Sequence, residues 1–495
     1  MISATDISYN EETVVGQIGK QRSPRLLLLS SSLLIDRVFL FTEFLNTLSA
    51  GSRAEIWAAS ARNSDIRDIW ESCPAAIREF PEVRPFKEFP YNYLRRLNEF
   101  AWDFRFRTPS RLSMWRHVRS KTIKPSLRAM RIPGKALSLM RLEKPFEEYL
   151  QNLLLAYPRS PEAFERLQGE RPDLVITTGP FQFEQPAIIA YAKKMGIPTM
   201  ALVPSWDNLS TKNRLTFKYD GYLVWSKQTR DELHYFYPHT REAPVYIIGA
   251  PQFDVFFQRR FHLSRETFCQ SQGLRADLPI IVYAVGSPNF LRGESRGALD
   301  FARRVMRGDL GDVQVIVRPH PLHDRGELTE MFREFAPRVV LQQPVVSATQ
   351  LLRSQNADHI TEWVNTFKHA DVVINLSSTV TVDAAIFDRP VVNLDYDPEP
   401  GGPQQQLIKD VNHSWHHFKP IAESGGVWLV NNPDEMIEAV RAYLANPELH
   451  GEKRRWIAEY VCQYLDGRCG ERMAEAVLDF AHNQVDRSSK RRELR

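Results

Sequence analysis

Two sets of short, uninterrupted apolar segments constrain the fold of this chain more than any other feature of the sequence. The first set runs from Leu26 to Ile248 and the second from Pro279 to Leu394, and turns or helical patterns separate the members of each set. Apolar runs of this length are typical of parallel strands that are buried on both faces. The pattern therefore predicts two successive α/β units, each with a parallel, doubly wound sheet.

The strands predicted in the first unit are Leu26–Leu29, a second one after the glycine turn at the end of residues 25–58, Leu174–Thr177, Thr199–Val203, Gly221–Trp225 and Val245–Ile248. Those predicted in the second unit are Pro279–Ala284, Val313–Val317, Asp371–Leu376 and Pro390–Leu394. The length of 495 residues accommodates two such units, since α/β domains of about 200–250 residues are common. We predict an N-terminal Rossmann-like domain over residues 1–255, with a helical insertion at 90–170, a second Rossmann-like domain over 256–455, and C-terminal helices with a basic tail over 456–495.

The four cysteines are scattered and form no CxxC pair, which argues against a disulfide scaffold or a cysteine-type zinc site. The first residues lack the pattern of a signal peptide. The most apolar stretch, Leu26 to Phe44, is interrupted by Asp36, Arg37 and Glu43, too often for a segment that crosses a bilayer. We therefore expect a cytoplasmic protein.

The positive charge of the chain is concentrated in one segment. Residues 105–144 contain twelve Lys or Arg and one acidic residue, Glu143, a net charge of +11, whereas the whole chain carries only +4. Apolar residues alternate with these cations, as in helices that lie on an anionic membrane surface. A solvated helical face is an equally good interpretation, and nucleic acid is a weaker one because no recognition motif accompanies the charge.

Polar residues follow the predicted strands of the second unit, where ligands of doubly wound sheets bind. Ser377, Ser378 and Thr379 stand between a strand and a helix, where hydroxyl and N–H groups can bind a phosphate; a plain helix cap is the alternative. Asp383 could accept hydrogen bonds from a ribose, or complement the helix dipole.

Two further loops of the second unit could approach the same phosphate. Arg318 and His320 directly follow a strand in R-P-H-P, and Ser377 comes 57 residues after His320. A cation and an imidazole there would neutralise a phosphate leaving group; a structural turn is the alternative. Gly286 and Ser287 end the first strand of this unit and form either a phosphate loop or an ordinary turn.

The first unit is expected to bind the acceptor and to supply a general base. Asp207, in P-S-W-D-N after a strand, is our first choice for that base, although an Asx-turn is the alternative. Glu184 and Asp36 are alternative bases. Lys212 could contact an anionic substrate, but an exposed lysine is the more common role.

Two other patterns suggest metal binding but are discounted. L-D-Y-D at 394–397 resembles a D-x-D metal motif but stands in the wrong part of such a fold, and a loop at the donor pocket is the better interpretation. His413, His416 and His417 lack a nearby cysteine or carboxylate in sequence to complete a zinc site. We expect no metal.

R-P-H-P followed by S-S-T-x-x-x-D resembles the nucleotide-binding domain of the CDP-glycerol glycerophosphotransferase and capsule-polysaccharide transferase group. Residues 416–449 and D-G-R-C-G-E-R at 466–472 are also similar to that group. The resemblance covers about 280–475 and implies a GT-B fold: two Rossmann-like domains with a cleft between them. It also implies that His320, Ser377, Ser378 and Thr379 hold donor phosphates, with Arg318 beside them, and that no cofactor is needed.

Together these features predict an inverting transferase of surface polysaccharide synthesis. It would move a sugar or a polyol phosphate from a nucleotide-sugar or CDP-polyol donor to a glycan or lipid-linked glycan acceptor, at the inner membrane face. A sugar-nucleotide 2-epimerase of the same fold is a rival, but such enzymes carry G-T-R-P-E near the first strand, where this chain has L-S-S-S-L-L-I-D-R. A non-catalytic scaffold with a transferase fold is the other rival.

Overall fold

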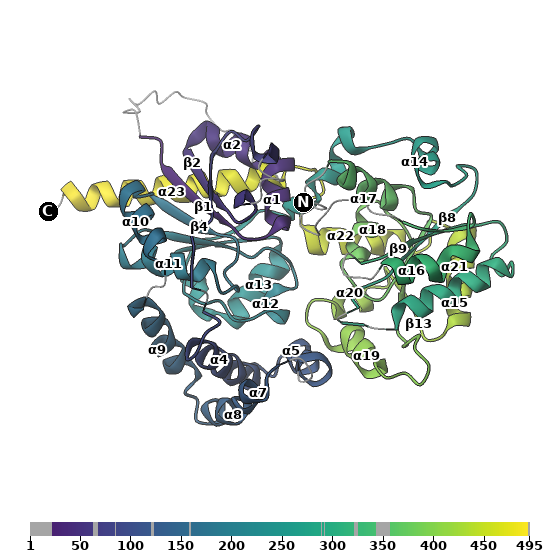
Figure 1. The fold of residues 1–495 in the computed structure, drawn as a ribbon, viewed down its shortest axis with the longest axis horizontal. Helices are drawn as coiled ribbons and strands as arrows, with labels where there is room; N and C mark the ends of the chain where they lie inside the picture. The colour runs from purple at the N-terminus through teal and green to yellow at the C-terminus, as the bar shows by residue number, and fades with distance from the viewer. Residues whose placement is uncertain are drawn as a thin grey trace, which may run out of the picture.

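A computed structural model describes residues 22–62, 68–84, 86–119, 123–157, 160–288, 290–291, 293–320, 325–342 and 357–493. In these residues the chain forms two parallel sheets that lie side by side in Figure 1, each covered by helices. The expected α/β class with two parallel sheets is confirmed.

The first sheet has the strand order β3-β2-β1-β4-β5-β6-β7 and the second the order β10-β9-β8-β11-β12-β13, and every pairing in both is parallel. The strands of the first sheet are β1 Arg25–Ser30, β2 Arg53–Ala58, β3 Ala76–Glu79, β4 Leu174–Thr177, β5 Thr199–Leu202, β6 Gly221–Val224 and β7 Val245–Ile247. Those of the second sheet are β8 Ile280–Ala284, β9 Gln314–Arg318, β10 Val339–Leu341, β11 Val372–Asn375, β12 Val391–Leu394 and β13 Trp428–Val430.

Both sheets reverse their direction of growth beside their first strand. The chain adds β2 and β3 on one side of β1 and then returns to place β4 on the other side, and it repeats this around β8 with β9, β10 and β11. Such reversals are where doubly wound sheets bind ligands, because the connections diverge at the carboxyl ends of the two central strands. The fold therefore offers two possible sites, beyond β1/β4 and beyond β8/β11.

Helices cover both faces of each sheet. Those of the first half are α1 Leu33–Phe41, α2 Phe44–Gly51, α10 Pro161–Glu170, α11 Gln185–Lys194, α12 Asn208–Thr211 and α13 Lys227–Phe236. Those of the second half are α14 Arg265–Gln272, α15 Glu294–Met306, α16 Arg325–Phe332, α17 Ala357–His369, α18 Val380–Ile386, α19 Gln405–Ser414, α20 Lys419–Glu423, α21 Pro433–Ala445 and α22 Gly451–Cys462. Short 3₁₀ turns are η1 Ser60–Arg62, η2 Asp68–Trp70, η4 Pro238–Glu242, η5 Pro251–Phe257, η6 Arg259–Phe261 and η7 Arg333–Phe335.

A helical insert lies below the first sheet in Figure 1. Its elements are α4 Tyr91–Phe106, α5 Pro109–Met114, the π-helical turn η3 Trp115–Arg119, α7 Pro125–Ala129, α8 Arg131–Leu139 and α9 Glu143–Ala156. The Ser113 hydroxyl on α5 donates a 2.7 Å hydrogen bond to Asp410 on α19, and Arg111 donates to the carbonyl of Leu209 at 3.2 Å. The insert thus contacts both halves of the molecule through α5.

The last helix, α23 Cys469–Glu493, crosses from the second half back to the first (Figure 1). Met473, Val477 and Phe480 are buried in the same cluster as Leu26 and Leu28 of β1. The carboxylate of Asp254 accepts hydrogen bonds from the backbone N–H groups of Cys469 (3.0 Å) and Gly470 (2.7 Å) where this helix begins. Sequence-distant residues therefore complete the core of the first half.

Candidate active site

A pocket of about 410 Å³ lies beyond the carboxyl ends of β8, β9 and β11, at the reversal point of the second sheet. It is lined by all eight residues that the sequence predicts at the donor: Gly286, Ser287, Arg318, His320, Ser377, Ser378, Thr379 and Asp383. Pro321, the last residue of the R-P-H-P motif, lies outside the described residues. The parallel sheet brings the three loops together because it aligns the ends of neighbouring strands.

The loop after β11 is held by amide side chains. Asn375 accepts hydrogen bonds from the N–H (3.0 Å) and hydroxyl (3.3 Å) of Ser378, and the Ser378 hydroxyl in turn accepts one from the Val380 N–H at 3.3 Å. Ser377 has a positive φ of 45° and donates its hydroxyl hydrogen to Asn412. A left-handed residue other than glycine is uncommon, so this loop has a conformation that its neighbours impose.

Glu294 joins two of the pocket loops and was not predicted from the sequence. Its carboxylate accepts hydrogen bonds from the backbone N–H groups of Gly286 (2.5 Å) and Leu376 (3.1 Å). Burial raises the pKa of Glu294 to about 8, against the effect of these two bonds. A Cβ at position 286 would lie 2.6 Å from the carboxylate, so glycine is needed there to admit Glu294.

Arg318 provides a buried cation at the end of β9. Its guanidinium donates a 2.5 Å hydrogen bond to the side chain of Gln342 and lies 5.7 Å from the centre of the Phe367 ring. Burial lowers its pKa, while the charges of Glu362 and Asp383 oppose that effect. Since an arginine keeps its proton in proteins, the pocket contains a fixed positive charge.

Asp383 faces this cation from α18. Burial raises its pKa to about 7, although the indole N–H of Trp363, 3.4 Å away, and the charges of Arg318 and Arg37 favour the ionised form. The helix has only seven residues, so the charges in the pocket come mainly from side chains rather than from a helix dipole.

Arg37 of the first half lies next to this pocket. It stands on α1 with its guanidinium 4.4 Å from the centre of the Trp363 ring, and Trp363 lines the pocket. Burial lowers the pKa of Arg37 to about 10, and the charge of Asp383 opposes that shift. The sequence signal that could have indicated this residue is an arginine beside Asp36, on the helix that follows the first strand and its loop.

Asp207 lies outside the lining of this pocket, in the loop between β5 and α12. Its carboxylate accepts hydrogen bonds from the hydroxyls of Ser205 (2.6 Å) and Thr211 (3.0 Å) and from the amide of Asn208 (3.0 Å). Burial opposes its ionisation, but His417, these hydroxyls and Lys212 together lower its pKa. The carboxylate is therefore ionised at neutral pH.

The loop that carries Asp207 meets the second half at His417. The Ser210 hydroxyl lies 3.3 Å from Nδ1 of His417, and the Trp206 ring packs edge-on against that imidazole at 5.0 Å. Burial lowers the pKa of His417 to about 4, so the ring is neutral at pH 7.

The two alternative bases lie in different surroundings. Asp36 is buried, and the hydroxyl of Ser30 donates to its carboxylate at 2.5 Å. Glu184 forms an ion pair with Lys87 at 2.9 Å; burial opposes the lowering of its pKa, and the bond and charge of Lys87 dominate. Neither residue lines the pocket.

The family profile of CDP-glycerol:poly(glycerophosphate) glycerophosphotransferases matches residues 190–479, more than half of the chain. The chain belongs to this family. The match includes both the R-P-H-P and the S-S-T loops, and it confirms the resemblance that those motifs indicate. This member of the family is thus a transferase that uses a nucleotide-activated donor for the synthesis of a cell-surface polymer.

Solved structures agree on the fold. A protein assigned as a UDP-N-acetylglucosamine 2-epimerase from Listeria monocytogenes superposes with a TM-score of 0.51 at 13% identity, over 92% of this chain and 96% of its own. A glycosyltransferase from Rickettsia africae gives a TM-score of 0.50 at 8% identity, over 93% and 99%. Curated protein sequences give no match. The GT-B architecture is confirmed, and an identity this low shows the fold alone.

The L-D-Y-D motif and the nearby histidines, both discounted as metal sites, form contacts within the chain. Asp395 of L-D-Y-D accepts hydrogen bonds from Lys409 (2.7 Å) and Asn412 (2.9 Å) and lies 2.8 Å from Nε2 of His413. A carboxylate that is distant in sequence thus lies beside His413, because α19 packs this histidine against the end of β12. Asp395 does not itself line the donor pocket, but it reaches Ser377 through Asn412.

Within the residues that the structure describes, no group of three or more His, Cys, Asp or Glu side chains is arranged to hold a metal ion. No described helix is both long and apolar enough to cross a membrane.

Proposed function

We propose that this chain transfers a polyol phosphate, or alternatively a sugar, from a nucleotide donor held in the pocket beyond β8, β9 and β11. The acceptor is a hydroxyl group of a glycan or lipid-linked glycan used in capsule or related polymer synthesis. One observation carries the proposal: three loops from three neighbouring strands place Arg318, His320 and the serine loop in one pocket. Its volume of about 410 Å³ is in the range of small-molecule sites.

Each group in the pocket has a role in this proposal. Arg318 and His320 neutralise the diphosphate of the donor. The hydroxyls of Ser377, Ser378 and Thr379 donate hydrogen bonds to it, for which Ser377 and Ser378 give up their bonds to Asn412 and Asn375. Asp383 accepts a hydrogen bond from the donor ribose. Gly286 and Ser287 shape the wall of the pocket, and no metal takes part.

The reaction is a direct displacement with inversion. With a CDP-polyol donor, the acceptor oxygen bonds to the distal phosphorus, the bond from that phosphorus to the bridging oxygen breaks, and CMP leaves with the electron pair. With a nucleotide sugar, the same oxygen attacks the anomeric carbon and the nucleoside diphosphate leaves. In both cases the proton of the acceptor passes to a general base.

Asp207 is the base that we propose, with Asp36 and Glu184 as alternatives. Its low pKa keeps it ionised, and its loop contacts His417 of the second half. Asp207→Asn tests this role: a base variant loses kcat by roughly 10²–10⁴-fold while the donor still binds. Unchanged turnover would remove Asp207 as the base.

The donor site is tested by thermal shift of the purified protein with CMP, CDP, UDP, GDP and dTDP. A nucleotide at 100 times its dissociation constant adds roughly 2.7 kcal/mol of stability. We expect a clear preference for one base, which His320→Ala abolishes. No shift with any of the five nucleotides would overturn the proposed donor site and favour the scaffold.

We further propose that the chain works at the inner face of the membrane, with the cationic segment 105–144 toward anionic lipid. The +11 charge of that segment supports this location. Cosedimentation with vesicles that contain phosphatidylglycerol measures it, and binding that persists at high salt would contradict an electrostatic attachment.

A further inference from the structure

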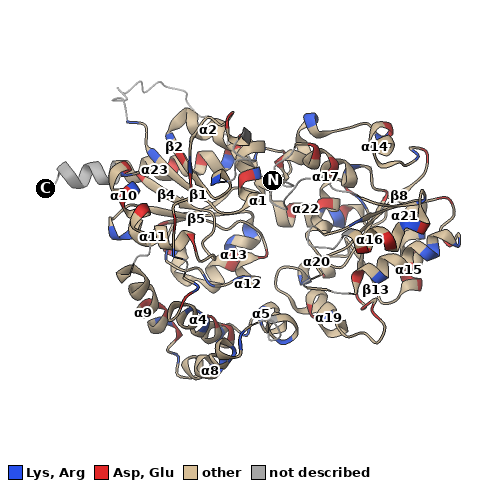
Figure 2. Cartoon of the chain, viewed as in Figure 1, with Lys and Arg blue, Asp and Glu red and all other residues tan. Residues whose placement is uncertain are grey.

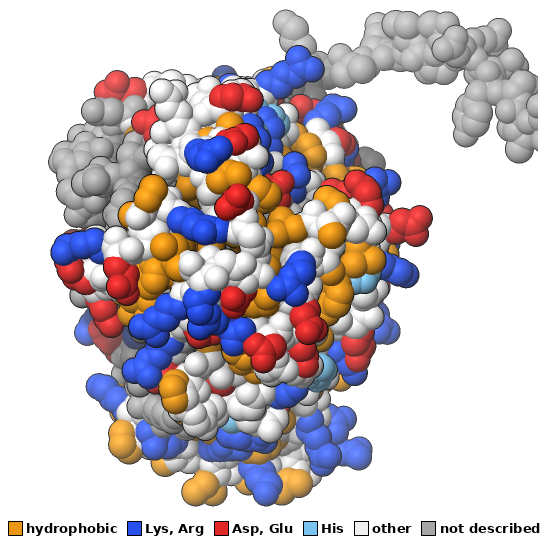
Figure 3. Space-filling view, turned by 90° about the vertical axis from the view of Figure 1, so that its right-hand side faces the viewer, with side chains coloured by type: hydrophobic (Ala, Val, Ile, Leu, Met, Phe, Trp, Pro, Cys, Tyr) orange, Lys and Arg blue, Asp and Glu red, His pale blue; other side chains and the backbone are white. Residues whose placement is uncertain are grey.

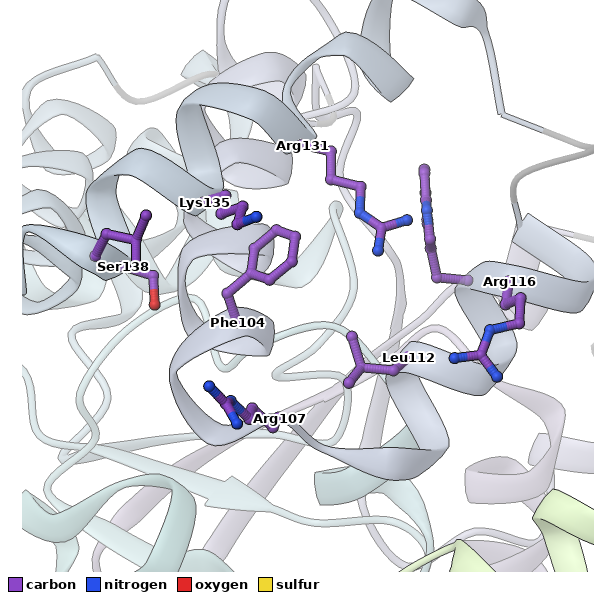
Figure 4. Close-up of a pocket in the computed structure, with 9 residues that line it drawn as sticks. Phe104, Arg107, Leu112, Arg116, Arg131, Lys135 and Ser138 are labelled. Atoms are coloured by element: carbon purple, nitrogen blue, oxygen red, sulfur yellow. The ribbon is translucent and has the colours of Figure 1, made fainter.

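The helical insert contains a second pocket, of about 530 Å³, whose lining is cationic and aromatic. Arg107 at the end of α4, Arg116 on η3, and Arg131 and Lys135 on α8 supply four positive charges. Phe104, Leu112, Trp115 and Leu139 supply apolar surface, and Ser138 adds a hydroxyl. Figure 4 shows the labelled cationic side chains arranged around Phe104 and Leu112.

Among the described residues, the lining of this pocket includes no acidic side chain to balance these charges. Within the described residues, Arg107, Arg131 and Lys135 form no ion pair, and the Arg131 guanidinium lies over the rings of Phe104 (5.4 Å) and Trp115 (5.7 Å). The nearest acids in sequence are already engaged: Asp103 pairs with Arg111 at 3.0 Å and Glu143 with Arg105 at 3.2 Å. Convergence of these three cations, which have no acidic partner within the described residues, favours an anionic ligand with several oxygens, such as a phosphate.

Exposed apolar side chains lie on α8, which carries Arg131 and Lys135, and directly after it. Ile132 is 79% exposed, Leu139 75% and Met140 58%. The lowest part of the view in Figure 3 shows hydrophobic and basic side chains together, and Figure 2 shows basic residues on α5 and α8. A ligand with both an anionic and a hydrocarbon part fits this surface better than an inorganic ion does.

The wall of this pocket is connected to the proposed base. Leu112 stands on α5, and its neighbours Ser110 and Arg111 bond to the carbonyls of Ser210 (2.5 Å) and Leu209 (3.2 Å). Those carbonyls belong to α12, which directly follows Asp207. A group bound in the pocket thus contacts α5, and α5 packs against α12, which follows Asp207.

We propose that the insert pocket binds the diphosphate or phosphodiester end of an acceptor whose other part is a hydrocarbon chain. Arg107, Arg116, Arg131 and Lys135 hold the phosphate oxygens, while Phe104, Trp115 and Leu139 contact the first carbons of the chain. This assignment rests on the proposed transferase function for its meaning as an acceptor site. The binding itself does not depend on that function.

Isothermal titration of the full chain with geranyl diphosphate tests the site, with inorganic pyrophosphate as the probe without hydrocarbon. We expect geranyl diphosphate to bind more tightly than pyrophosphate. Arg131→Gln with Lys135→Gln should weaken it at least about tenfold, because charge-assisted hydrogen bonds are lost. Lys135→Gln alone, at an exposed position, gives a smaller loss in the same direction and guards against misfolding of the double variant.

The matched control is Arg128→Gln with Lys144→Gln, which removes the same charge from exposed positions of the same segment outside the pocket. Equal losses in both double variants would show a diffuse charge effect and overturn the proposal. Equal affinities for the two probes would overturn the hydrocarbon part, and binding only to phosphatidylglycerol vesicles would replace the pocket by a membrane surface. His320→Ala should leave geranyl diphosphate binding unchanged while it abolishes nucleotide binding, so failure of one site is distinguishable from failure of the other.

Discussion

The two sheets of the molecule reverse direction in the same way, yet the described loops at the two reversal points have different partners. Beyond β8 and β11, the loops surround a pocket lined by Arg318, His320 and the serine loop. Beyond β1 and β4, backbone N–H groups of the loop after β4 bond to a side chain of the chain itself. The same topology therefore supports either a ligand or an internal network, and the residues that follow the strands decide which.

Gln185 is the centre of the network in the first half. Its side-chain oxygen accepts hydrogen bonds from the N–H groups of Thr178 (3.0 Å) and Gly179 (2.9 Å) and from the Thr177 hydroxyl (2.6 Å). Its amide donates to the hydroxyl of Ser31 at 2.7 Å. The N–H groups that could hold a phosphate are thus already satisfied by one side chain.

Glu294 in the second half, like Gln185, is the first residue of a helix that follows a central strand, but it leaves more of the site open. It also accepts two backbone N–H bonds from loops that follow adjacent strands. However, Arg318 and the three hydroxyl residues still line the pocket. The comparison shows that a bridging side chain and a ligand site can share one reversal point.

His320→Ala should have the largest effect on this contrast. Loss of a group that neutralises the donor phosphates lowers kcat/KM by roughly 10²–10³-fold, whereas the melting temperature stays close to that of the wild type. Steady-state kinetics with the preferred donor measures it. An unchanged kcat/KM would contradict the role of His320 at the donor phosphates.

Arg37→Met tests the contribution of Arg37, which lies on the first half, to the stability of the contact with the second half. It removes a buried cation near Asp383, and such losses cost about 3 kcal/mol of unfolding free energy. Urea unfolding measures the change. Arg53→Met, at an exposed position of β2, is the control that should stay near the wild type, and an equal effect in both would remove the special role of Arg37.

Gln185→Leu tests the hydrogen-bond network at the reversal point of the first sheet. It leaves buried N–H and hydroxyl donors unsatisfied and should lower the unfolding free energy by about 2 kcal/mol. Stabilisation by the preferred nucleotide should be unchanged, because that ligand binds the other sheet. Nucleotide binding that falls with Gln185→Leu but not with Lys194→Met, on the exposed face of the same helix, would contradict the assignment.

The smallest effect concerns pH and Glu294. Because the folded pKa of about 8 lies above the ordinary value of 4.5, the folded state binds the proton more tightly, and the group contributes stability that is lost as the pH rises toward 8. Glu294→Gln removes this dependence. The melting temperature of the wild type minus that of the variant should fall as the pH rises from about 5 to about 9; a constant value would contradict the raised pKa.

The central strands were predictable because burial on both faces leaves an unmistakable apolar run. Leu174–Thr177 has the predicted bounds, and the other predicted strands differ at their ends by a residue or two. The edge strands β3, β10 and β13 were missed. Two of them have only three residues and the third, A-I-R-E, is largely exposed, so neither length nor hydrophobicity marks them.

The candidate donor residues were predictable for a related reason. The parallel sheet turns a rule about position, directly after a strand, into proximity in space. Glu294, Arg37 and Gln342 could not be found in this way, since each reaches the pocket from a helix, from the other half or from an edge strand. Their contacts depend on side-chain packing that one-dimensional patterns do not show.

The return of α23 to the first half has a consequence for biosynthesis. Part of the hydrophobic cluster around β1 is supplied by Met473, Val477 and Phe480, which leave the ribosome more than 200 residues after β7. While the second half is translated, the hydrophobic cluster around β1 therefore lacks the side chains of α23 and stays partly exposed. Chaperones that bind nascent chains should find that face during this interval, and ribosome-bound chains that end before α23 should be more sensitive to protease than chains that include it.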